Sequence, residues 1–379
     1  MSEALKTDLY ELTMLAAYHR AGHNPLATFE LFARRLPTNR GYLVFAGLEQ
    51  ALSFLEEFSF SPEDIDYLRG LPAFAGAAEG FFDMLAGLRF TGDVWAVPEG
   101  TAVFAGEPLL RVTAPLWEAQ IVETWLLSAI HLQTLVASKA ARVVDAAREL
   151  AVFDFGSRRA HGPEAGLFAA RASYIGGCSG TSNCEAGRRF GIPVAGTMAH
   201  SYVMSFPSER EAFQNYLALH PGGTTLLVDT YDIVEAAKLA ASLGPACKAV
   251  RIDSGDLAQL AVKVRKALDD AGRKDVRIIL SGNLNEYRIE KLLKARAPVD
   301  AFGVGTEMVV SADAPALDLV YKLVETDGRP VAKRSRGKST VGGRKQVWRT
   351  FDKRGRMLRD CVGLDGERLP GEQLLVQVM

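Results

Sequence analysis

The sequence predicts an α/β protein in which repeated strand and helix units follow a smaller unit of mixed helices and strands. Between residues 116 and 325, helical stretches alternate with short apolar runs. Consecutive runs end roughly twenty to forty residues apart, the length of one strand, loop, helix and return. The pattern before residue 115 is mixed, and the chain becomes polar after Tyr321. We therefore expect domains over 1–115 and 116–325, and a C-terminal extension over 326–379 that packs on the N-terminal domain.

The composition excludes disordered and fibrous proteins. Of the 379 residues, 48% are hydrophobic and 23% are charged, enough to bury a large core. The net charge of -1 creates no field that would favour nucleic acid or an anionic membrane as a partner. No apolar run approaches the roughly eighteen residues that span a bilayer, and the acidic N-terminal region does not resemble a secretion signal. We expect a cytoplasmic protein that binds a small molecule.

The four cysteines predict neither a disulfide framework nor a structural metal site. Cys178, Cys184, Cys247 and Cys361 are scattered and form no CxxC pair. Zinc sites need Cys and His at short spacings, so we interpret these residues as free thiols.

The first 115 residues combine helix and strand signals. Thr7 to Ala21 has the pattern of an amphipathic helix, and Thr28 to Phe32 alternates like a strand. Apolar residues at helical spacing predict a helix over Gly41 to Phe58, and Ser61-Pro62-Glu63-Asp64 predicts the capped start of another. From Gly92 to Pro115, proline and glycine separate short apolar pieces, which favours strands and tight turns.

Six apolar runs in the second region end on small or acidic residues. They are Val152-Phe153-Asp154, Pro193-Val194-Ala195-Gly196, Leu226-Leu227-Val228-Asp229, Val250-Arg251-Ile252-Asp253, Ile278-Ile279-Leu280-Ser281 and Ala301-Phe302-Gly303. In an α/β barrel the chemistry gathers at the C-terminal ends of the strands. An open doubly wound sheet would give a similar pattern, so periodicity alone favours a barrel only modestly. No GxGxxG segment followed by a ribose-binding acid is present, which weakens the dinucleotide-binding alternative.

The segment from Arg329 to Arg354 carries ten basic residues and one acid, Asp352. One interpretation is a solvated loop of the C-terminal extension. The alternative is a mobile clamp on phosphate groups, built from the interleaved residues Gly337, Lys338, Gly342, Gly343, Arg344 and Lys345. Nucleic-acid binding is least favoured, because the run belongs to a neutral chain without a recognisable nucleic-acid motif.

Two glycine-containing loops after the last two runs are candidate phosphate ligands. Ser281-Gly282 and Gly303-Val304-Gly305-Thr306 let backbone N–H groups approach an anion closely. In barrels a phosphate commonly lies on the loops after the final strands. A GxGT turn is more often only a turn, but two such loops in the expected order favour a phosphate site.

Charged residues at the end of the fourth run are candidates for substrate and metal binding. Arg251 and Asp253 share one face of a strand, so both can point into one pocket. Arginine can bind a carboxylate through two hydrogen bonds, and Asp253 and Asp256, which flank Ser254 and Gly255, can hold Mg2+ or ribose hydroxyls. The alternative is an Arg–Asp pair that only fixes the strand. We favour a functional role, because a charge in an apolar strand is costly to bury unless it is paired.

His200 and Arg158 follow two other runs. His200 lies near the hydroxyls of Thr197 and Ser201, where a role as nucleophile or as acid and base competes with a structural one. Arg158 and Arg159 lie in a cationic loop that suits an anionic substrate, although adjacent arginines are often only surface residues. No GxSxG segment supports a hydrolase.

Six segments together point to one enzyme family. In chain order they are TDLYELTM at 7–14, FDFGSRRAHG at 153–162, GTSNCEAGRRFGIPVAGTMAHSYV at 180–203, LLVDTYD at 226–232, RIDSGDL at 251–257 and FGVGTEM at 302–308. They resemble nicotinate phosphoribosyltransferase over roughly residues 7 to 325, and the resemblance extends weakly through KSTVGGRKQVWR.

The resemblance implies an irregular α/β barrel with an N-terminal α/β sandwich domain, paired as a homodimer with shared active sites. It implies that Tyr10 stacks on nicotinate from the neighbouring subunit, and that Thr197 and Arg251 hold the pyridine and its carboxylate. Thr306 would contact the phosphate of the second substrate, 5-phosphoribosyl 1-diphosphate. The other expected substrate-binding residues are Arg158, Ser254, Gly255, Asp256, Ser281, Gly282, Gly303 and Gly305.

The implied reaction is attack of the pyridine nitrogen on the anomeric carbon as diphosphate leaves, through an oxocarbenium-like state. Arg251 and Asp253 are expected to act catalytically, and Mg2+ near Asp253 and Asp256 would stabilise the departing charge. His200 matches the histidine that ATP phosphorylates in this family, which would drive the reaction toward nicotinate mononucleotide.

Three alternatives are open. Nicotinamide phosphoribosyltransferase shares the architecture, but a neutral amide gives no reason for a carboxylate-binding Arg251. Quinolinate phosphoribosyltransferase would release carbon dioxide and would not need ATP. A catalytically silent nucleotide-binding protein is disfavoured by the intact acids, glycines and His200.

Overall fold

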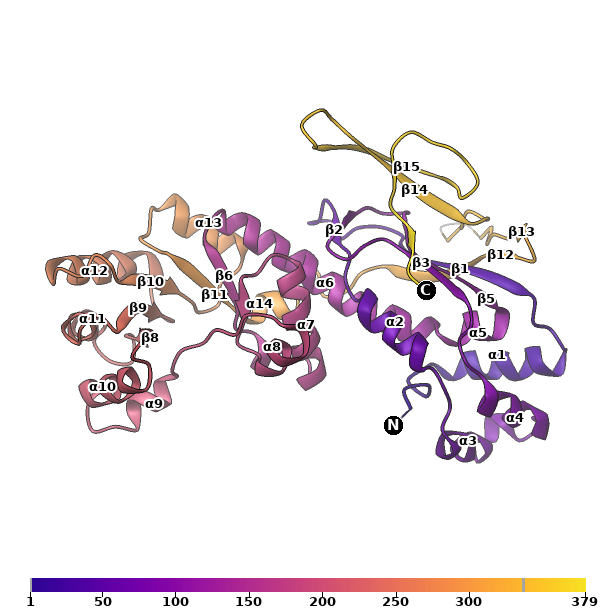
Figure 1. The fold of residues 1–379 in the computed structure, drawn as a ribbon, viewed down its shortest axis with the longest axis horizontal. Helices are drawn as coiled ribbons and strands as arrows, with labels where there is room; N and C mark the ends of the chain where they lie inside the picture. Colours follow the sequence, from indigo (N-terminus) through magenta and orange to yellow (C-terminus); the bar gives the residue numbers. More distant parts are fainter. Residues whose placement is uncertain (1, 336–337) are drawn as a thin grey trace. The chain divides into compact units, whose positions relative to one another are not determined.

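The computed structural model describes residues 2–335 and 338–379, so Gly337 of the basic segment lies outside the described residues. The chain forms two compact units, whose elements are labelled in Figure 1. Unit 1 contains the residues up to Leu135 together with those from Ala316 onward, and unit 2 contains Val136–Pro315. The first boundary lies within the continuous helix α6 (Glu123–Ala147), later than the residue 115 expected from the sequence.

Unit 1 is built around a six-stranded antiparallel sheet in the order β13-β12-β1-β5-β3-β17. Two smaller sheets pair β2 with β4 and order three strands as β15-β14-β16. The strands of the unit are β1 (Leu26–Ala33), β2 (Leu43–Val44), β3 (Asp93–Ala96), β4 (Ala102–Val103), β5 (Pro108–Pro115), β12 (Leu319–Thr326), β13 (Arg329–Pro330), β14 (Lys345–Phe351), β15 (Met357–Leu364), β16 (Glu372–Gln373) and β17 (Val376–Gln377).

The helices of unit 1 share one hydrophobic core with the large sheet. Leu15, Phe29, Leu55, Phe81 and Leu110 are all buried in this core. The helices are α1 (Leu9–Arg20), α2 (Leu48–Glu57), α3 (Pro62–Arg69), η1 (Pro72–Phe74), α4 (Glu79–Gly87) and α5 (Leu116–Ile121). Helix α3 begins with the predicted capping box, in which Ser61 and Asp64 each accept a hydrogen bond from the other's backbone N–H.

The C-terminal segment belongs to the same unit as the N-terminal strands. Strand β17 pairs antiparallel with β3, and β12 pairs with β1, so segments far apart in the sequence, which differ strongly in colour, lie side by side in Figure 1. Lys345 of β14 is 9% exposed, and its Nζ lies 2.8 Å from Oε2 of the fully buried Glu30 in β1.

The helix predicted over Gly41 to Phe58 is shorter than expected. Leu43–Val44 forms strand β2 against β4, and the helix begins only at Leu48. Gly47 separates strand β2 from helix α2, because its φ of 104° is one that helical residues do not adopt. The pairing partner of β2 lies almost sixty residues away, so a local helical pattern could not reveal it.

Unit 2 contains a six-stranded parallel sheet that curls as a half-barrel, which confirms the predicted α/β class. The strand order is β7-β6-β11-β10-β9-β8. The strands are β6 (Ala151–Asp154), β7 (Gly180–Thr181), β8 (Thr224–Leu227), β9 (Cys247–Ile252), β10 (Arg277–Leu280) and β11 (Ala301–Val304).

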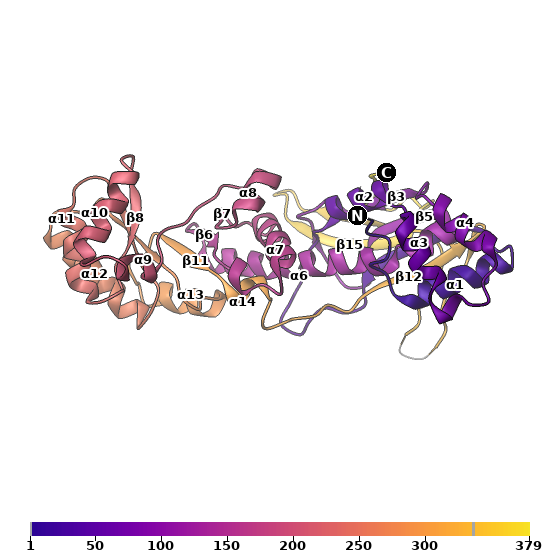
Figure 2. The same ribbon diagram turned by 90° about the horizontal axis from the view of Figure 1, so that it is seen from below.

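Helices flank this sheet and follow its strands. They are η2 (Ser157–Arg159), α7 (Pro163–Ile175), α8 (Cys184–Phe190), α9 (His200–Met204), α10 (Glu209–Leu219), α11 (Ile233–Ser242), α12 (Leu257–Asp270), α13 (Glu286–Lys294) and α14 (Thr306–Val309). Helices α7 and α8 pack on each other through Leu167, Ala170 and Ala186 (Figure 2). Asp232, Asp256 and Asn285 cap the starts of α11, α12 and α13, because each side chain accepts a hydrogen bond from a first-turn N–H.

The run Pro193 to Gly196 was predicted as a strand, and this prediction is wrong. Val194 makes only an isolated parallel bridge to Thr181. The bridge consists of two backbone hydrogen bonds to Thr181, one accepted by the carbonyl oxygen of Pro193 and one donated by the N–H of Ala195, so the run lies beside β7 without continuing as a strand.

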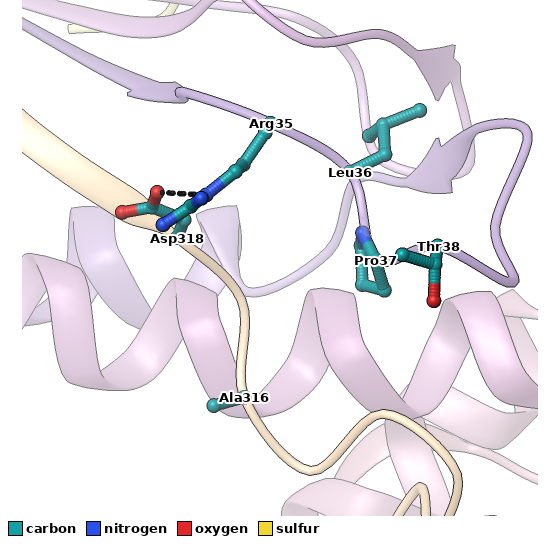
Figure 3. A pocket seen from close by; sticks show the side chains of 6 residues that line it. All are labelled: Arg35, Leu36, Pro37, Thr38, Ala316 and Asp318. Atoms are coloured by element: carbon teal, nitrogen blue, oxygen red, sulfur yellow. Dashed lines mark hydrogen bonds and ion pairs between the residues drawn. The ribbon is translucent and has the colours of Figure 1, made fainter. Parts of the chain in front are cut away.

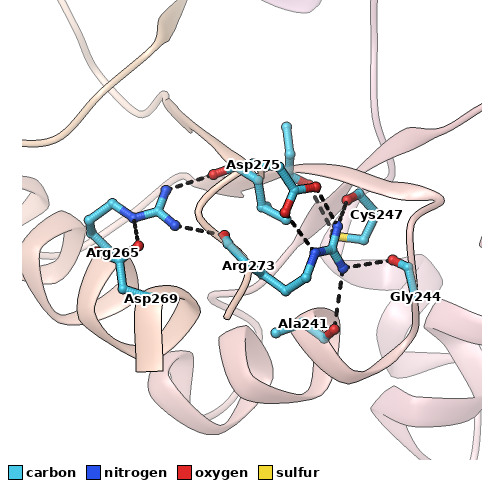
Figure 4. A network of polar contacts seen from close by, with 9 residues as sticks. Ala241, Gly244, Cys247, Arg265, Asp269, Arg273 and Asp275 are labelled. Atoms are coloured by element: carbon cyan, nitrogen blue, oxygen red, sulfur yellow. Dashed lines mark hydrogen bonds and ion pairs between the residues drawn. The ribbon is translucent and has the colours of Figure 1, made fainter. Parts of the chain in front are cut away.

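Arg273 ties together several elements at the edge where the strands of this sheet begin (Figure 4). Its guanidinium donates to the carbonyl oxygens of Ala241, Gly244 and Cys247 and pairs with Asp275 at 2.8 Å. Arg265 donates in turn to the carbonyl oxygen of Arg273. Within the described residues, no helix combines the length and apolarity that crossing a bilayer requires.

Candidate active site

The loops that follow the strands of unit 2 meet at the C-terminal edge of the parallel sheet. In the register, Leu280 lies beside both Ile252 and Phe302, and Val304 lies beside Asp154. The segments after β6, β9, β10 and β11 therefore leave the sheet next to one another. This edge collects most of the residues that the sequence singled out.

Hydrogen bonds connect the ends of β8, β9 and β10. The carboxylate of Asp229 accepts the backbone N–H of Asp253 at 3.0 Å and the hydroxyl of Ser254 at 2.6 Å. The hydroxyl of Ser281 donates to the carboxylate of Asp253 at 2.5 Å. These contacts hold two carboxylates and two hydroxyls in one cluster.

His200 begins helix α9 beside this cluster. Its Nδ1 lies 3.1 Å from the hydroxyl of Thr230, and its Nε2 lies 3.9 Å from Oδ1 of Asp229. The imidazole is 39% exposed, whereas the Asp229 side chain is 5% exposed. Within the described residues, Oδ1 of Asp229 has no hydrogen-bond partner. A buried carboxylate and the hydroxyl of Thr230 thus lie beside an accessible imidazole and fix its orientation.

Arg251 lies on β9 and uses only part of its hydrogen-bonding capacity. Its Nη2 donates to the carbonyl oxygen of Met198 at 3.2 Å, while its buried Nε has no partner within the described residues. Burial lowers the pKa of Arg251, the carboxylates of Asp253 and Asp229 raise it, and the nearby charge of Arg158 lowers it further. A desolvated guanidinium with an unused donor is suited to bind an anionic ligand group.

The glycines at the ends of β10 and β11 are required by close approach. A Cβ at Gly282, whose φ is 97°, would lie 1.8 Å from the carbonyl oxygen of Asp253. A Cβ at Gly303 would lie 2.4 Å from the ring of Phe155. Only glycine leaves these strand ends close enough for both contacts.

The loop after β6 is held by a buried carboxylate. Asp154 accepts hydrogen bonds from the hydroxyl of Thr181 at 2.7 Å and from the N–H of Gly156 at 2.8 Å. Burial raises the pKa of Asp154, although both hydrogen bonds oppose that rise. The N–H of Phe155 donates to the carbonyl oxygen of Val304, which joins this loop to the end of β11. Arg158 follows in η2 and is exposed.

The remaining predicted residues have mixed positions. Thr197 lies in the irregular segment before α9, and Thr306 is the first residue of α14. Gly255 has a φ of 82°, and Asp256 is an exposed residue whose Oδ1 caps α12. Tyr10 is different, because it lies in α1 of unit 1 and is 48% exposed.

Two other expectations can be compared with the structure. Arg344 pairs with Glu325 at 3.1 Å and Lys345 pairs with Glu30, so two of the three cations of the hypothetical phosphate clamp already have structural partners. Among the residues that the structure describes, no group of three or more His, Cys, Asp or Glu side chains is arranged to hold a metal ion.

A cavity of about 280 Å³ lies in unit 1, and none of the residues that line it was predicted as a site residue (Figure 3). It is lined by Arg35, Leu36, Pro37, Thr38, Ala316 and Asp318. Figure 3 shows the guanidinium of Arg35 turned toward Asp318, and their Nε and Oδ2 atoms are 2.9 Å apart. The cavity therefore offers no unpaired charge from this pair.

Comparison with known proteins decides the family. Residues 5–131 match the family model of the nicotinate phosphoribosyltransferase (NAPRTase) N-terminal domain, and residues 150–359 match that of the nicotinate phosphoribosyltransferase (NAPRTase) family. The chain belongs to the nicotinate phosphoribosyltransferase family.

Individual relatives agree with this family. The chain is 51% identical over 382 aligned residues to nicotinate phosphoribosyltransferase pncB2 of Mycobacterium tuberculosis, covering 99% of this chain and 81% of the relative. It is 44% identical to the Bacillus subtilis nicotinate phosphoribosyltransferase, with coverage of 93% and 74%. The crystal structure of human nicotinic acid phosphoribosyltransferase superposes with a TM-score of 0.86 at 31% identity, covering 98% of this chain and 89% of that one.

Sequence interpretation missed four residues of this candidate site. Asp154 and Phe155 organise the loop after β6, and Asp229 and Thr230 contact His200. A signal was available, since all four lie in the FDFG and LLVDTYD segments that carry the family resemblance. Their roles depend on contacts between distant segments, which the segments alone do not show.

Proposed function

We propose that the C-terminal edge of the unit 2 sheet is where this nicotinate phosphoribosyltransferase joins nicotinate to 5-phosphoribosyl 1-diphosphate. The products are nicotinate mononucleotide and diphosphate. One observation carries the assignment of the site: the desolvated Arg251 guanidinium, with an unused donor, lies on the same sheet edge as the glycine loops after β10 and β11. That edge offers a place for a carboxylate and a place for a phosphate.

Nicotinate binds through its carboxylate in this proposal. Arg251 binds the carboxylate with the help of Arg158, and the hydroxyl of Thr197 contacts the pyridine. Tyr10 stacks on the ring from the neighbouring subunit of a homodimer with shared active sites. Its exposed side chain supports that role, because an aromatic face open to solvent can cover a second subunit's ligand.

The sugar phosphate binds on the loops after β10 and β11. Ser281, Gly282, Gly303, Gly305 and Thr306 supply hydroxyl and backbone N–H donors, and Ser254 and Gly255 extend this surface toward β9. The glycines support the proposal because they allow the close packing against Asp253 and Phe155 that brings these loops together at one edge of the sheet.

The reaction is displacement of diphosphate from the anomeric carbon by the pyridine nitrogen. Asp253 lies near the ribose, where its carboxylate stabilises the positive charge that develops on the sugar. When Mg2+ is bound, it offsets the charge of the departing diphosphate. Asp253 and Asp256 would hold the ion together with substrate oxygens. Their hard oxygen donors suit Mg2+, and the hydrogen bonds described above use only one oxygen of each carboxylate.

ATP enters through His200. We propose that ATP phosphorylates the imidazole and that hydrolysis of the phosphohistidine drives the transfer toward product. The half-exposed ring beside Asp229 and Thr230 supports this role, because a nucleophilic imidazole needs both access and a fixed orientation.

The acceptor and the ATP effect can be tested together. Nicotinate, nicotinamide and quinolinate are supplied in turn with 5-phosphoribosyl 1-diphosphate, with and without ATP, and the mononucleotide is quantified. We expect product from nicotinate, stimulated by ATP. Preference for nicotinamide, or carbon dioxide release from quinolinate, would contradict the proposed acceptor.

His200→Ala tests the ATP step separately. We expect this variant to keep its basal rate and to lose the stimulation by ATP, because transfer to nicotinate does not itself require the imidazole. The mononucleotide assay at fixed nicotinate, run with and without ATP, measures both rates. Retained stimulation would remove His200 from the mechanism.

A further inference from the structure

A buried charge cluster lies in unit 2 among residues to which the proposed mechanism gives no role. Lys139 of helix α6 is fully buried. Its Nζ lies 2.6 Å from Oε2 of Glu286 and 2.8 Å from Oδ1 of Asp313. Arg142, one turn further along the helix, donates from Nε to Oε1 of Glu286 at 3.0 Å. The two cations and two carboxylates balance in charge.

Such a cluster calls for an explanation other than stability. Removing a lysine ammonium from water is costly, and apolar residues of similar volume generally stabilise a core as well as a buried ion pair does. What an ion cluster provides instead is a defined geometry, because a misplaced partner leaves a buried charge unpaired. Burial alone would raise the pKa of Glu286, but hydrogen bonds from Lys139 and Arg142 hold it below its ordinary value.

The two carboxylates come from the segments that follow neighbouring strands. Glu286 is the first residue of α13, at the end of the short loop that begins with Ser281 after β10. Asp313 lies a few residues beyond α14, which begins at Thr306 after β11. One ammonium group therefore contacts both chain segments that leave the proposed phosphate pocket.

Both segments contain backbone conformations that need support. Asn283 has a φ of 50° and Ser311 has a φ of 44°, in the left-handed region that non-glycine residues rarely adopt. Such residues persist only where the surrounding structure determines them. The Lys139 contacts supply a fixed point just after each of these residues.

We propose that Lys139 is a positioning residue that sets the loops after β10 and β11 at the spacing required to bind the phosphate of 5-phosphoribosyl 1-diphosphate. The inference rests on the proposed phosphate pocket. Lys139 touches no substrate in this arrangement and acts through Glu286 and Asp313. Its removal would break the link between Asp313 and Glu286, which keeps its pair with Arg142, so the two loops would no longer be held at this spacing.

Kinetics of Lys139→Met separate this role from general stabilisation. We expect the KM for 5-phosphoribosyl 1-diphosphate to rise by about tenfold or more, because small displacements of binding groups have large kinetic effects. The KM for nicotinate should change much less, since Arg251 and Thr197 lie on other segments. An equal rise in both KM values would overturn the proposal.

Val143→Ala is the matched control. Val143 is a fully buried apolar residue of the same helix, so this variant also weakens the core of unit 2. We expect it to lower the melting temperature without separating the two KM values. A separation as large as that of Lys139→Met would show that the effect is only loss of stability.

Asp313→Asn provides a second variant if Lys139→Met does not fold. Its side chain is 21% exposed, so the chain should tolerate the change, while the contact to the β11 segment is weakened. The KM for 5-phosphoribosyl 1-diphosphate should rise here too, and an unchanged value would contradict the proposal.

Calorimetric titration with 5-phosphoribosyl 1-diphosphate keeps the two proposals distinct. If the wild type binds this substrate but makes no nicotinate mononucleotide, the proposed function fails. Weaker binding by Lys139→Met or Asp313→Asn would still support the positioning role, and binding equal to that of the wild type would remove it.

Discussion

In the proposed site, the guanidinium of Arg251 selects nicotinate as the acceptor substrate. Arg251 is desolvated, lies near the carboxylates of Asp229 and Asp253, and keeps one buried N–H without a partner in the described part of the chain. The two carboxylates favour the charged form of the Arg251 guanidinium, which burial disfavours. The ligand carboxylate would complete the hydrogen bonding of Arg251, so the free enzyme is prepared for an acid and not for an amide.

Arg251→Ala should therefore impair nicotinate use selectively. Loss of a charged hydrogen-bonding group is expected to raise the KM for nicotinate by roughly 10- to 100-fold, with a much smaller effect on 5-phosphoribosyl 1-diphosphate. Arg277→Ala is the control, because Arg277 is an exposed arginine at the opposite end of a neighbouring strand. Equal losses for both substrates would contradict the assignment of Arg251.

Gly282→Ala should damage the phosphate side of the site. The added Cβ would meet the carbonyl oxygen of Asp253 and would also place a side chain at a φ of 97°. We expect a loss of about 1–3 kcal/mol in stability and a higher KM for 5-phosphoribosyl 1-diphosphate.

Gly272→Ala separates these two effects. Gly272 has a φ of 74°, but nothing lies within 4 Å of a Cβ built there. The change in the free energy of unfolding of Gly272→Ala, measured by chemical denaturation, therefore reflects backbone strain alone. If both glycine variants keep wild-type kinetics, close approach at Gly282 has no part in substrate binding.

At the scale of elements, the sequence predicted strand ends better than it predicted pairing. Four of the predicted runs contain strands, and these strands end at or within two residues of Asp154, Asp229, Asp253 and Ser281. Their ends were visible because a buried parallel strand is apolar throughout and stops where polar loop residues begin. Strand β7 escaped notice, since Gly180–Thr181 is too short to form a pattern.

Contacts between distant segments set the rest of the site. Asp229 reaches Ser254, and Lys139 reaches Glu286 from more than a hundred residues away. No local periodicity encodes such pairs. The residue types at the site could therefore be predicted, whereas the contacts that hold these residues in position could not.

Arg273 offers a test of how the sheet is held at the edge opposite the site. Its guanidinium satisfies three carbonyl oxygens from the end of α11, the following turn and the start of β9, and it pairs with Asp275 (Figure 4). Arg273→Ala should destabilise unit 2 by about 2–4 kcal/mol, because these carbonyl groups lose their donors together. Arg273→Lys should recover only part of this, since an ammonium cannot reproduce the planar fork.

Chemical denaturation measures this effect, and Lys266→Ala is its control. Lys266 pairs with Asp270, but its side chain is 74% exposed, so its loss should change stability by less than about 0.5 kcal/mol. Similar losses for Arg273→Ala and Lys266→Ala would show that the carbonyl contacts contribute little.

At the scale of the whole chain, the C-terminal segment is part of the N-terminal fold. Strand β17 pairs with β3, and Lys345 binds the buried Glu30. The sequence showed a basic segment and left open a clamp on phosphate. It could not show that Lys345 has a buried acidic partner more than three hundred residues away.

The same attachment makes the stability of unit 1 depend on pH. Glu107, just before β5, is 5% exposed, and its carboxyl group is hydrogen-bonded to that of Asp360 of β15. Burial raises the pKa of Glu107 from 4.5 to about 7, and the charge of Asp360 adds to the rise, while the hydrogen bond from the N–H of Phe104 opposes it. Arg349 pairs with Asp360 at 2.6 Å, and its hydrogen bond holds the pKa of Asp360 low although burial would raise it.

Stability should therefore fall as the pH rises from about 4.5 through about 7. In that window folded Glu107 keeps a proton that the unfolded chain has released, so this group makes unfolding more favourable as the pH rises and contributes a slope of at most about 1.4 kcal/mol per pH unit. Glu107→Gln cannot lose a proton and should flatten this part of the profile while still donating to Asp360. Glu372→Gln, an exposed change in the same region, should leave the profile as it is. Denaturation midpoints measured across this range compare the three proteins, and a Glu107→Gln profile as steep as the wild type would mean that the proton is held elsewhere.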